Sequence, residues 1–278
     1  MQFGLDSYSF HLRLGKHDDF KPSEPTDTRW FLQKVVELGY DGFQLDPAHI
    51  ESADEAYLAE IRDFAQEHNL YVEWGSAGVD PIRLIGDLKS AHFVGAKVLR
   101  TFLGYSPLLP KAERERRLAQ AGENLRQAAP YAEQFEVKIA IENHVDVMIK
   151  ELKELIWMVG SPWVGVCLDT TNNLFLGEDP LYATRELAPY IYATHLKDCL
   201  MTSALAPQIV HPLALGEGNL PLAEIITLIR QGSGLERFTI EVPTEAKNSL
   251  APSTLDETEL LAKEEEKVRR SLAYARAH

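Results

Sequence analysis

Cysteine is scarce in this chain. Cys167 and Cys199 are its only two cysteines, and they do not form a CxxC pair. A disulfide framework or a zinc cluster needs more cysteines at closer spacings, so the sequence predicts neither. We expect both residues to be free thiols.

Long apolar runs are also lacking. No stretch approaches the roughly 18 apolar residues that a membrane-spanning helix needs. The opening residues, MQFGLDSYSF, carry neither the basic segment nor the long apolar segment of a signal peptide. We therefore expect a cytoplasmic protein without a membrane partner.

Basic residues are too few for nucleic acid to be a default partner. Lysine and arginine number 28 against 42 aspartates and glutamates, which gives a formal net charge of −14. Such a surface repels a phosphate backbone instead of releasing its counterions. A GxGxxG turn after the first strand is missing too, which argues against an open sheet that binds a dinucleotide.

The chain does contain short β-rich runs that alternate with longer amphipathic segments, a pattern typical of βα units around a parallel sheet. Eight such runs can be counted, and 278 residues suffice for one barrel with one core. We predict a single (β/α)8 barrel, of the TIM-barrel class, as one domain over residues 1–278. Its expected strands are Gln2–Ser9, Gly42–Asp46, Leu70–Trp74, Lys97–Phe102, Val137–Glu142, Val164–Asp169, Ile191–His195 and Phe238–Val242.

Residues that start helices lie between these runs. Capping residues or prolines precede several apolar-periodic segments, at Thr26 to Thr28, Ser52, Asp80-Pro81 and Pro221. These signals predict crossover helices at 29–38, 53–68, 82–94 and 222–230. A last helical segment, 261–278, is expected to close the outer ring.

Each of the last four predicted strands ends in a residue that can bind a metal ion. Side chains two positions apart on a strand share a face, so the small residues Ala140, Gly165, Cys167, Ala193 and Thr239 share the face of these strand ends. Bulky apolar residues occupy the other face, where they suit packing against helices. The four candidate metal ligands are therefore expected to point into the barrel mouth: Glu142, Asp169, His195 and Glu241.

Three carboxylates and one imidazole suit a divalent cation. Oxygen-rich sites of this kind favour Mn²⁺ or Mg²⁺, with Co²⁺ or Zn²⁺ as further candidates. Barrel enzymes place their chemistry at the C-terminal ends of strands, which is where these residues lie. The sequence thus predicts one divalent metal ion at the centre of an active site.

With these residues in view, the whole chain resembles the xylose-isomerase-like barrels, a group of sugar phosphate isomerases and epimerases. The likeness is most specific in the Glu, Asp, His, Glu series and in the segment LGEGNL, Leu215 to Leu220. The group includes ketose 3-epimerases, inosose dehydratases and dehydroshikimate dehydratases. The resemblance implies that Glu142 and Glu241 are both metal ligands and the catalytic acid and base.

Two positions carry opposite implications within that group. The epimerases usually have a substrate-binding histidine three residues after the strand-six aspartate, where this chain has Asn172. The motif HLKD resembles the inosose dehydratases and places Lys197 beside His195. An isomerase or epimerase acting on a ketose or keto-polyol is the leading expectation. A lyase that dehydrates a cyclic keto-polyol or cleaves a 3-keto-glycoside, and a non-catalytic sugar-binding barrel, remain as alternatives.

Further polar and aromatic residues lie near strand ends or in the following loops, where they would suit a polyhydroxylated ligand. Each also has a structural interpretation, as a loop cap or a packed side chain. We expect a small carbohydrate as the ligand, and self-association into a homo-oligomer is compatible with the sequence. The candidate substrate contacts are His144, Asn172, Lys197, His211, Tyr8, Glu73 and Arg100, with Glu217 in a loop that could act as a lid.

Overall fold

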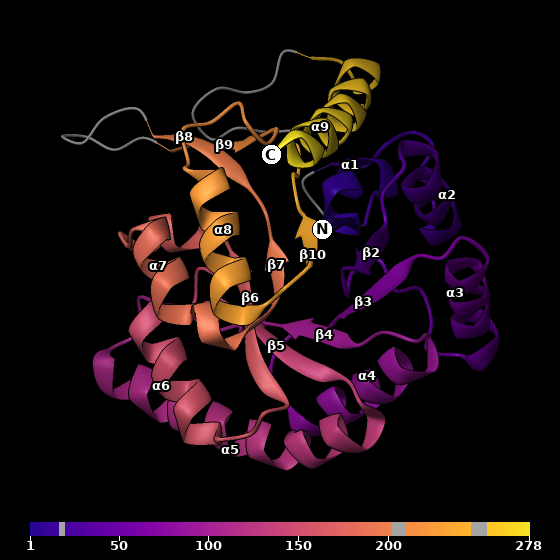
Figure 1. Ribbon diagram of the computed structural model, residues 1–278. Coiled ribbons are helices and arrows are strands. Elements are labelled where there is room, and N and C mark those ends of the chain that lie inside the picture. The colour runs from indigo at the N-terminus through magenta and orange to yellow at the C-terminus, as the bar shows by residue number, and fades with distance from the viewer. Residues whose placement is uncertain (17–19, 202–208, 246–254) are drawn as a thin grey trace.

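The computed structural model describes residues 1–16, 20–201, 209–245 and 255–278, without the side chains of residues 209–211. Its central feature is a parallel sheet of eight strands that curves into a barrel (Figure 1). In chain order these strands are β1 Gln2–Asp6, β2 Gly42–Leu45, β3 Tyr71–Gly75, β4 Val98–Thr101, β5 Lys138–Glu142, β6 Val164–Asp169, β7 Ile191–His195 and β10 Arg237–Ile240.

Hydrogen bonds next to β7 and β10 close the barrel. The sheet order runs β10-β1-β2-β3-β4-β5-β6-β7. The Leu196 amide donates to the Thr239 carbonyl (2.8 Å), and the Glu241 amide donates to the Leu196 carbonyl (3.1 Å). These bonds join the two ends of the sheet and confirm the predicted (β/α)8 barrel.

Helices surround the strands as an outer ring (Figure 1). In the described part of the chain, no helix is long and apolar enough to cross a membrane. The α-helices are α1 His11–Leu14, α2 Thr28–Leu38, α3 Glu55–Glu67, α4 Pro81–Phe93, α5 Lys111–Phe135, α6 Ile149–Val159, α7 Pro180–Leu187, α8 Leu222–Ser233 and α9 Glu257–Ala277; short 3-10 helices cover Ser7–Phe10, Asn172–Leu176 and Ala188–Tyr190.

Several predicted element bounds are wrong by one to four residues, including the end of α8, which is Ser233 instead of residue 230, and the start of α9, which is Glu257 instead of residue 261. The first strand ends at Asp6 instead of Ser9, because the Asp6 side chain accepts a hydrogen bond from the Tyr8 amide and starts a 3-10 helix. Helix α3 begins at Glu55, two residues later than predicted, and its N-cap is Asp54. The cap signals at Asp27 and Asp80 are confirmed, since both side chains accept hydrogen bonds from the first turn of their helices.

The predicted alternation of small and bulky residues along the strands is confirmed. Inside the barrel, Ala140, Cys167 and Ala193 form a small cluster of their own. The large core lies between the barrel and the helices. It contains all eight outward-facing apolar residues of β5, β6 and the β10 segment: Ile139, Ile141, Val164, Val166, Leu168, Phe238, Ile240 and Val242. Cys167 and Cys199 are both buried free thiols, as expected.

An antiparallel hairpin, absent from the prediction, follows β7. It consists of β8 Asp198–Met201 and β9 Ile209–Leu213. Helix α9 lies near this hairpin on the same side of the barrel (Figure 1). The buried Lys267 Nζ of α9 donates to the carbonyls of Pro212 (2.9 Å) and Pro243 (2.6 Å). The C-terminal helix thereby joins the hairpin to the segment that follows Glu241.

Glu264, one turn earlier on α9, makes the stability of this arrangement depend on pH. Its side chain is fully buried and accepts a hydrogen bond from the Leu12 amide (2.9 Å). Burial raises the pKa of Glu264 to about 8. Above the ordinary pKa of a glutamate, the Glu264 carboxyl group is ionised in the unfolded chain but still protonated in the folded chain. The free energy of unfolding that this difference contributes is therefore lost as the pH rises toward 8.

We expect Glu264→Gln to abolish this dependence. Between pH 5 and pH 8, urea unfolding should show the unmutated protein losing on the order of 3 kcal/mol relative to Glu264→Gln, because each pKa unit is worth about 1.4 kcal/mol. Burial lowers the pKa of Lys267 to about 7; this group is present in both proteins, so its pH dependence cancels from the comparison except for the small part that Glu264 itself contributes. Glu266→Gln, on the exposed face of α9, is the matched control. Parallel pH profiles for Glu264→Gln and the unmutated protein would contradict the prediction.

Candidate active site

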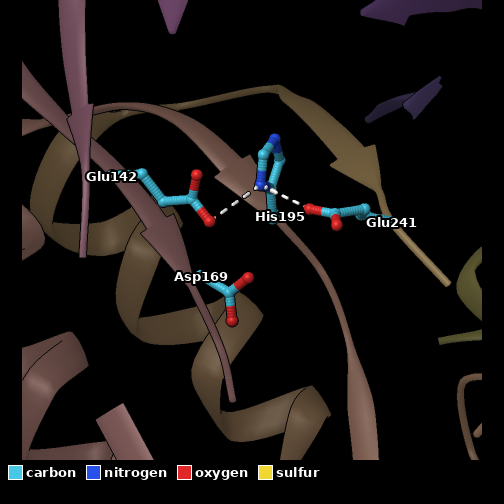
Figure 2. A group of neighbouring side chains, drawn as sticks. All are labelled: Glu142, Asp169, His195 and Glu241. Carbon is cyan, nitrogen blue, oxygen red and sulfur yellow. Dashed lines mark ion pairs between the residues drawn. The ribbon is translucent and has the colours of Figure 1, made fainter. Parts of the chain in front are cut away.

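Four side chains meet at the C-terminal end of the barrel. Glu142 ends β5, Asp169 ends β6, His195 ends β7, and Glu241 follows β10 directly. All four are buried, and one donor atom from each lies within 4.8 Å of all the others. Figure 2 shows Glu142 and Glu241 on either side of the His195 ring, with Asp169 below. The structure therefore brings the four predicted ligands together in a cluster that could hold a metal ion.

A chain of hydrogen bonds fixes the orientation of His195. The Thr239 hydroxyl and the Gln44 amide both donate to Glu73 Oε2 (2.8 Å each). Gln44 Oε1 is then left to accept the proton of His195 Nε2 (2.8 Å). This arrangement turns His195 Nδ1 toward Glu142 Oε1 (3.3 Å) and Glu241 Oε2 (2.6 Å). Such outer partners are what select the tautomer of a metal-binding histidine.

Two buried cations keep the glutamates ionised. Arg100 Nε donates to Glu142 Oε2 (2.6 Å), and Arg100 Nη2 contacts the same oxygen. Burial alone would raise the pKa of Glu142, but Arg100 and His195 outweigh it and hold this pKa well below its usual range. Lys197 Nζ lies 2.9 Å from both Asp169 Oδ2 and Glu241 Oε1. Carboxylates must be ionised to bind a metal, so these ion pairs prepare the ligands.

The loop after β6 holds Asp169 and Glu142 in place. Asp169 Oδ1 accepts hydrogen bonds from the backbone amides of Thr171 (2.8 Å) and Asn172 (2.9 Å). The side-chain amide of Asn172 donates to Glu142 Oε1 (2.9 Å). Asn172, predicted as a substrate contact, thus binds a candidate metal ligand in this structure.

The donor atoms themselves fit a cation. Within the described residues, the buried atoms Asp169 Oδ2, His195 Nδ1 and Glu241 Oε2 make no well-aligned hydrogen bond, although Lys197 Nζ forms an ion pair with Asp169 Oδ2 and His195 Nδ1 lies close to Glu241 Oε2. Buried polar atoms are nearly always satisfied, so three unsatisfied atoms that face one another indicate a missing partner. An unprotonated Nδ1 between two carboxylates is stable only with a positive charge among them. A divalent ion meets both conditions.

A cavity of about 490 Å³ opens above the cluster. Among the predicted substrate contacts, Tyr8, Arg100, His144 and Lys197 line it, and Glu142 and Glu241 form part of its wall. Its described lining residues are Tyr8, Asp46, Pro47, Ala48, Ala77, Arg83, Arg100, Phe102, Glu142, His144, Lys197 and Glu241.

One predicted substrate contact, Glu73, lies elsewhere. Glu73 is 3% exposed, is held by Gln44 and Thr239, and borders a second cavity at the N-terminal end of the barrel. It is thus a buried partner of Gln44 at this end of the barrel. His211 belongs to β9, and its side chain lies outside the described part of the structure. Glu217 lies near the exterior, where its carboxylate contacts Arg270.

Two site residues were not singled out from the sequence. Arg83, in the first turn of α4, lines the cavity. It could have been suspected because the helix after a barrel strand begins at the catalytic end. Phe102 follows β4 and stacks on His144, with ring centroids 4.9 Å apart. No sequence pattern indicates that pairing, because the two residues lie on different βα units.

The LGEGNL segment is organised by Asp198, the last residue of the HLKD motif. Its carboxylate accepts hydrogen bonds from the backbone amides of Gly216 (2.9 Å) and Gly218 (3.0 Å). A Cβ atom on Gly218 would lie 2.1 Å from Asp198 Oδ1 and 2.2 Å from the Cys199 carbonyl oxygen. Both motifs are thus parts of one loop arrangement beside Lys197.

Gly218→Ala should therefore destabilise the protein. The added methyl group meets a backbone carbonyl that cannot easily move, and overpacking of this kind costs about 1–3 kcal/mol. Denaturant unfolding measures the change. Gly86→Ala in α4 is the matched control, because no atom of the described residues lies within 4 Å of its added Cβ and alanine favours a helix. Equal stabilities of the two variants would refute the prediction.

Solved structures with this architecture cover the entire chain. D-psicose 3-epimerase with D-tagatose, from Clostridium cellulolyticum H10, superposes with a TM-score of 0.74 at 14% identity, over 100% of this chain and 99% of that one. The IolI protein with a zinc atom superposes with a TM-score of 0.72 at 14% identity, over 99% of each chain. At these identities the superpositions show the shared fold.

A curated relative and a family match complete the comparison. The 3-oxo-isoapionate decarboxylase of Pectobacterium atrosepticum is 25% identical over 199 residues, which are 71% of this chain and 69% of that protein. Residues 32–278 match the family described as Xylose isomerase-like TIM barrel. This range includes seven of the eight barrel strands and all four clustered side chains. The chain therefore belongs to the xylose isomerase-like TIM barrel family.

Proposed function

We propose that this protein is a divalent-metal-dependent sugar isomerase or epimerase that acts on a ketose or keto-polyol. The observation that carries the proposal is the placement of two ionised glutamates on either side of one cluster, both in the wall of the same cavity. A reaction that removes a proton from one face of a carbon and returns a proton to the opposite face needs two such groups. Related structures with this fold include an epimerase with a bound ketose, which supports the assignment.

Glu142, Asp169, His195 and Glu241 would hold the ion. Their three carboxylates and one imidazole suit Mn²⁺ or Mg²⁺, and the zinc atom in the IolI protein keeps Zn²⁺ and Co²⁺ among the candidates. When bound, a divalent ion polarises a substrate carbonyl and makes the adjacent C–H more acidic. The unsatisfied Asp169 Oδ2, His195 Nδ1 and Glu241 Oε2 are the atoms that support this assignment.

The side chains around the cavity would then have different roles in the reaction. One of Glu142 and Glu241 takes the proton from carbon, and the other returns a proton to the opposite face. Lys197 Nζ, between Asp169 and Glu241, balances their charge and can donate a hydrogen bond to a substrate oxygen. Tyr8 and the stacked pair of Phe102 and His144 offer ring faces and polar edges to the carbon skeleton.

A lyase reaction is the second candidate, favoured by the cations of the site. Removal of a proton next to a carbonyl, which precedes loss of water, or loss of CO₂ itself forms an enolate with a negative charge, and Arg100 and Lys197 line the cavity where that charge would form. The decarboxylase from Pectobacterium atrosepticum, a relative by sequence, supports this alternative. It would use the same ligand set. Dehydration would need one glutamate to take the proton from carbon and an acid to protonate the leaving hydroxyl group, whereas loss of CO₂ would need only an acid to protonate the resulting enolate.

Incubation with candidate substrates in D₂O separates the possibilities. Ketoses, inososes, 3-dehydroshikimate and 3-keto sugar acids are incubated with the protein and Mn²⁺ and followed by NMR. Deuterium at a stereocentre supports the isomerase or epimerase, whereas loss of water or CO₂ supports the lyase. Binding without exchange or product formation would leave a sugar-binding barrel and overturn the catalytic proposal.

A further inference from the structure

The guanidinium of Arg100 is fixed, and one of its nitrogens remains available. Nε and Nη2 bind Glu142, and the group lies over the Phe102 ring, 5.2 Å from its centroid. Arg100 is 5% exposed, and its Nη1 makes a long ion pair with Asp46 Oδ2 (3.7 Å) but no hydrogen bond among the described residues. A buried charged N–H group without an acceptor is costly, so Nη1 points to an acceptor supplied by a ligand in the cavity that Arg100 lines.

The cations around the cavity are compatible with a negative ligand. Three cations line it, Arg83, Arg100 and Lys197, and three carboxylates face them, Asp46, Glu142 and Glu241. Asp169 adds a fourth carboxylate to the metal cluster. A divalent ion in that cluster would add two positive charges, and Asp87 beside Arg83 adds one negative charge, so these groups balance one another. A site with this balance accepts a negative ligand more readily than the surface of the chain as a whole, which carries −14.

Arg83 provides a second guanidinium group, which lies at the rim of the same cavity. Its side chain is 51% exposed, and its Nε lies 3.5 Å from Asp87 Oδ2. The α4 N-terminus that carries it is already capped, because Asp80 accepts the Arg83 amide (3.0 Å) and Pro81 has no N–H group. Few backbone donors therefore remain for a phosphate, whereas guanidinium forks match the two oxygens of a carboxylate.

We propose that the substrate is a keto-sugar acid whose carboxylate is bound by Arg100 Nη1 and Arg83. This inference rests on the proposed function and narrows its substrate class from neutral ketoses to carboxylate-bearing ones. Arg100 then has two tasks, to hold Glu142 through Nε and Nη2 and to bind the substrate through Nη1.

Matched pairs of ligands test the inference by calorimetry on the Mn²⁺-loaded protein. D-fructuronate and D-fructose differ only in a carboxylate or a hydroxymethyl group at one end, as do D-tagaturonate and D-tagatose. We expect the acid to bind at least about tenfold more tightly in one or both pairs, as a charge-assisted hydrogen bond allows. Arg83→Gln should reduce the acid-to-ketose ratio about fivefold or more. Lys89→Gln, which removes an exposed charge from the same helix, should leave the ratio unchanged.

The outcomes separate this inference from the proposed function. Equal affinities within both pairs, or no binding of either acid, would overturn the carboxylate site, and so would an unchanged ratio in Arg83→Gln. Tighter binding of D-fructose 6-phosphate than of D-fructuronate would also overturn it, in favour of a phosphate. A preliminary titration with Mn²⁺ alone tests the metal site, so failure to bind Mn²⁺ counts against the proposed function. Acid preference without deuterium exchange or product formation would uphold the inference and overturn the catalytic proposal.

Discussion

Glu241→Gln and Glu142→Gln should each lower kcat by about 10²–10⁴-fold, because a positioned carboxylate that transfers a proton is worth roughly that factor. A glutamine has nearly the same shape but cannot take up a proton. It is also a weaker ligand, and it would break the ion pair with Lys197 or Arg100 that each glutamate makes. Steady-state kinetics on the substrate identified by NMR, at several Mn²⁺ concentrations, measure the loss.

A matched control shows whether the loss belongs to these positions. Glu236→Gln, next to the opposite end of β10, removes an exposed carboxylate paired with Arg230 and should leave kcat near its normal value. Comparison with Asp169→Asn separates ligation from proton transfer. Asp169 has no acid or base role in the proposal. Saturating Mn²⁺ should therefore restore part of the activity of the Asp169→Asn variant but little of the activity of the Glu241→Gln variant. Near-normal turnover in either glutamate variant would sink the assignment of an acid and base pair.

The sequence predicts the ligand cluster because strand parity is a local property. Glu142 and Ala140 lie two residues apart, as do Asp169 and Cys167, so each pair shares a face once the strands are recognised. The structure confirms this, since Ala140 and Cys167 form the small cluster beneath the four donor atoms. The eight strands were predictable for the same reason, with errors limited to their ends.

The partners of that cluster were not predictable in the same way. Arg100 and Glu142 are 42 positions apart, and Gln44 and His195 are 151 apart. Their contacts depend on side-chain rotamers across the barrel, which no periodicity encodes. The hairpin β8–β9 also escaped prediction, because no two-residue turn such as Asn-Gly marks it in the sequence. Glu73 and Gln44 are paired in register on neighbouring strands, and both side chains face the inside of the barrel. Glu73 lies too deep in the barrel to line the cavity, and it contacts Gln44 instead.

Removal of divalent metal should abolish activity, and addition of Mn²⁺ should restore it. Without an ion, His195 Nδ1 lies 3.3 Å from Glu142 and 2.6 Å from Glu241, and these carboxylates favour a proton on that nitrogen, which a bound cation would replace. A cation in the cluster binds the folded state alone, so it should also raise Tm, by an amount that grows with its concentration. At a free Mn²⁺ concentration 100 times its Kd, binding adds about 2.7 kcal/mol to the free energy of unfolding.

Differential scanning fluorimetry and activity assays on the chelator-treated protein measure both effects. His195→Gln is the matched variant, because glutamine keeps a polar side chain at the end of β7 but removes the imidazole ligand. Its Tm should respond much less to Mn²⁺ than that of the unmutated protein. Lys89→Gln, on the outer ring, should respond as the unmutated protein does. Full activity in excess chelator would show that the reaction does not need a metal ion. A Tm that does not respond to any of Mn²⁺, Mg²⁺, Co²⁺ or Zn²⁺ would show that the cluster does not bind one.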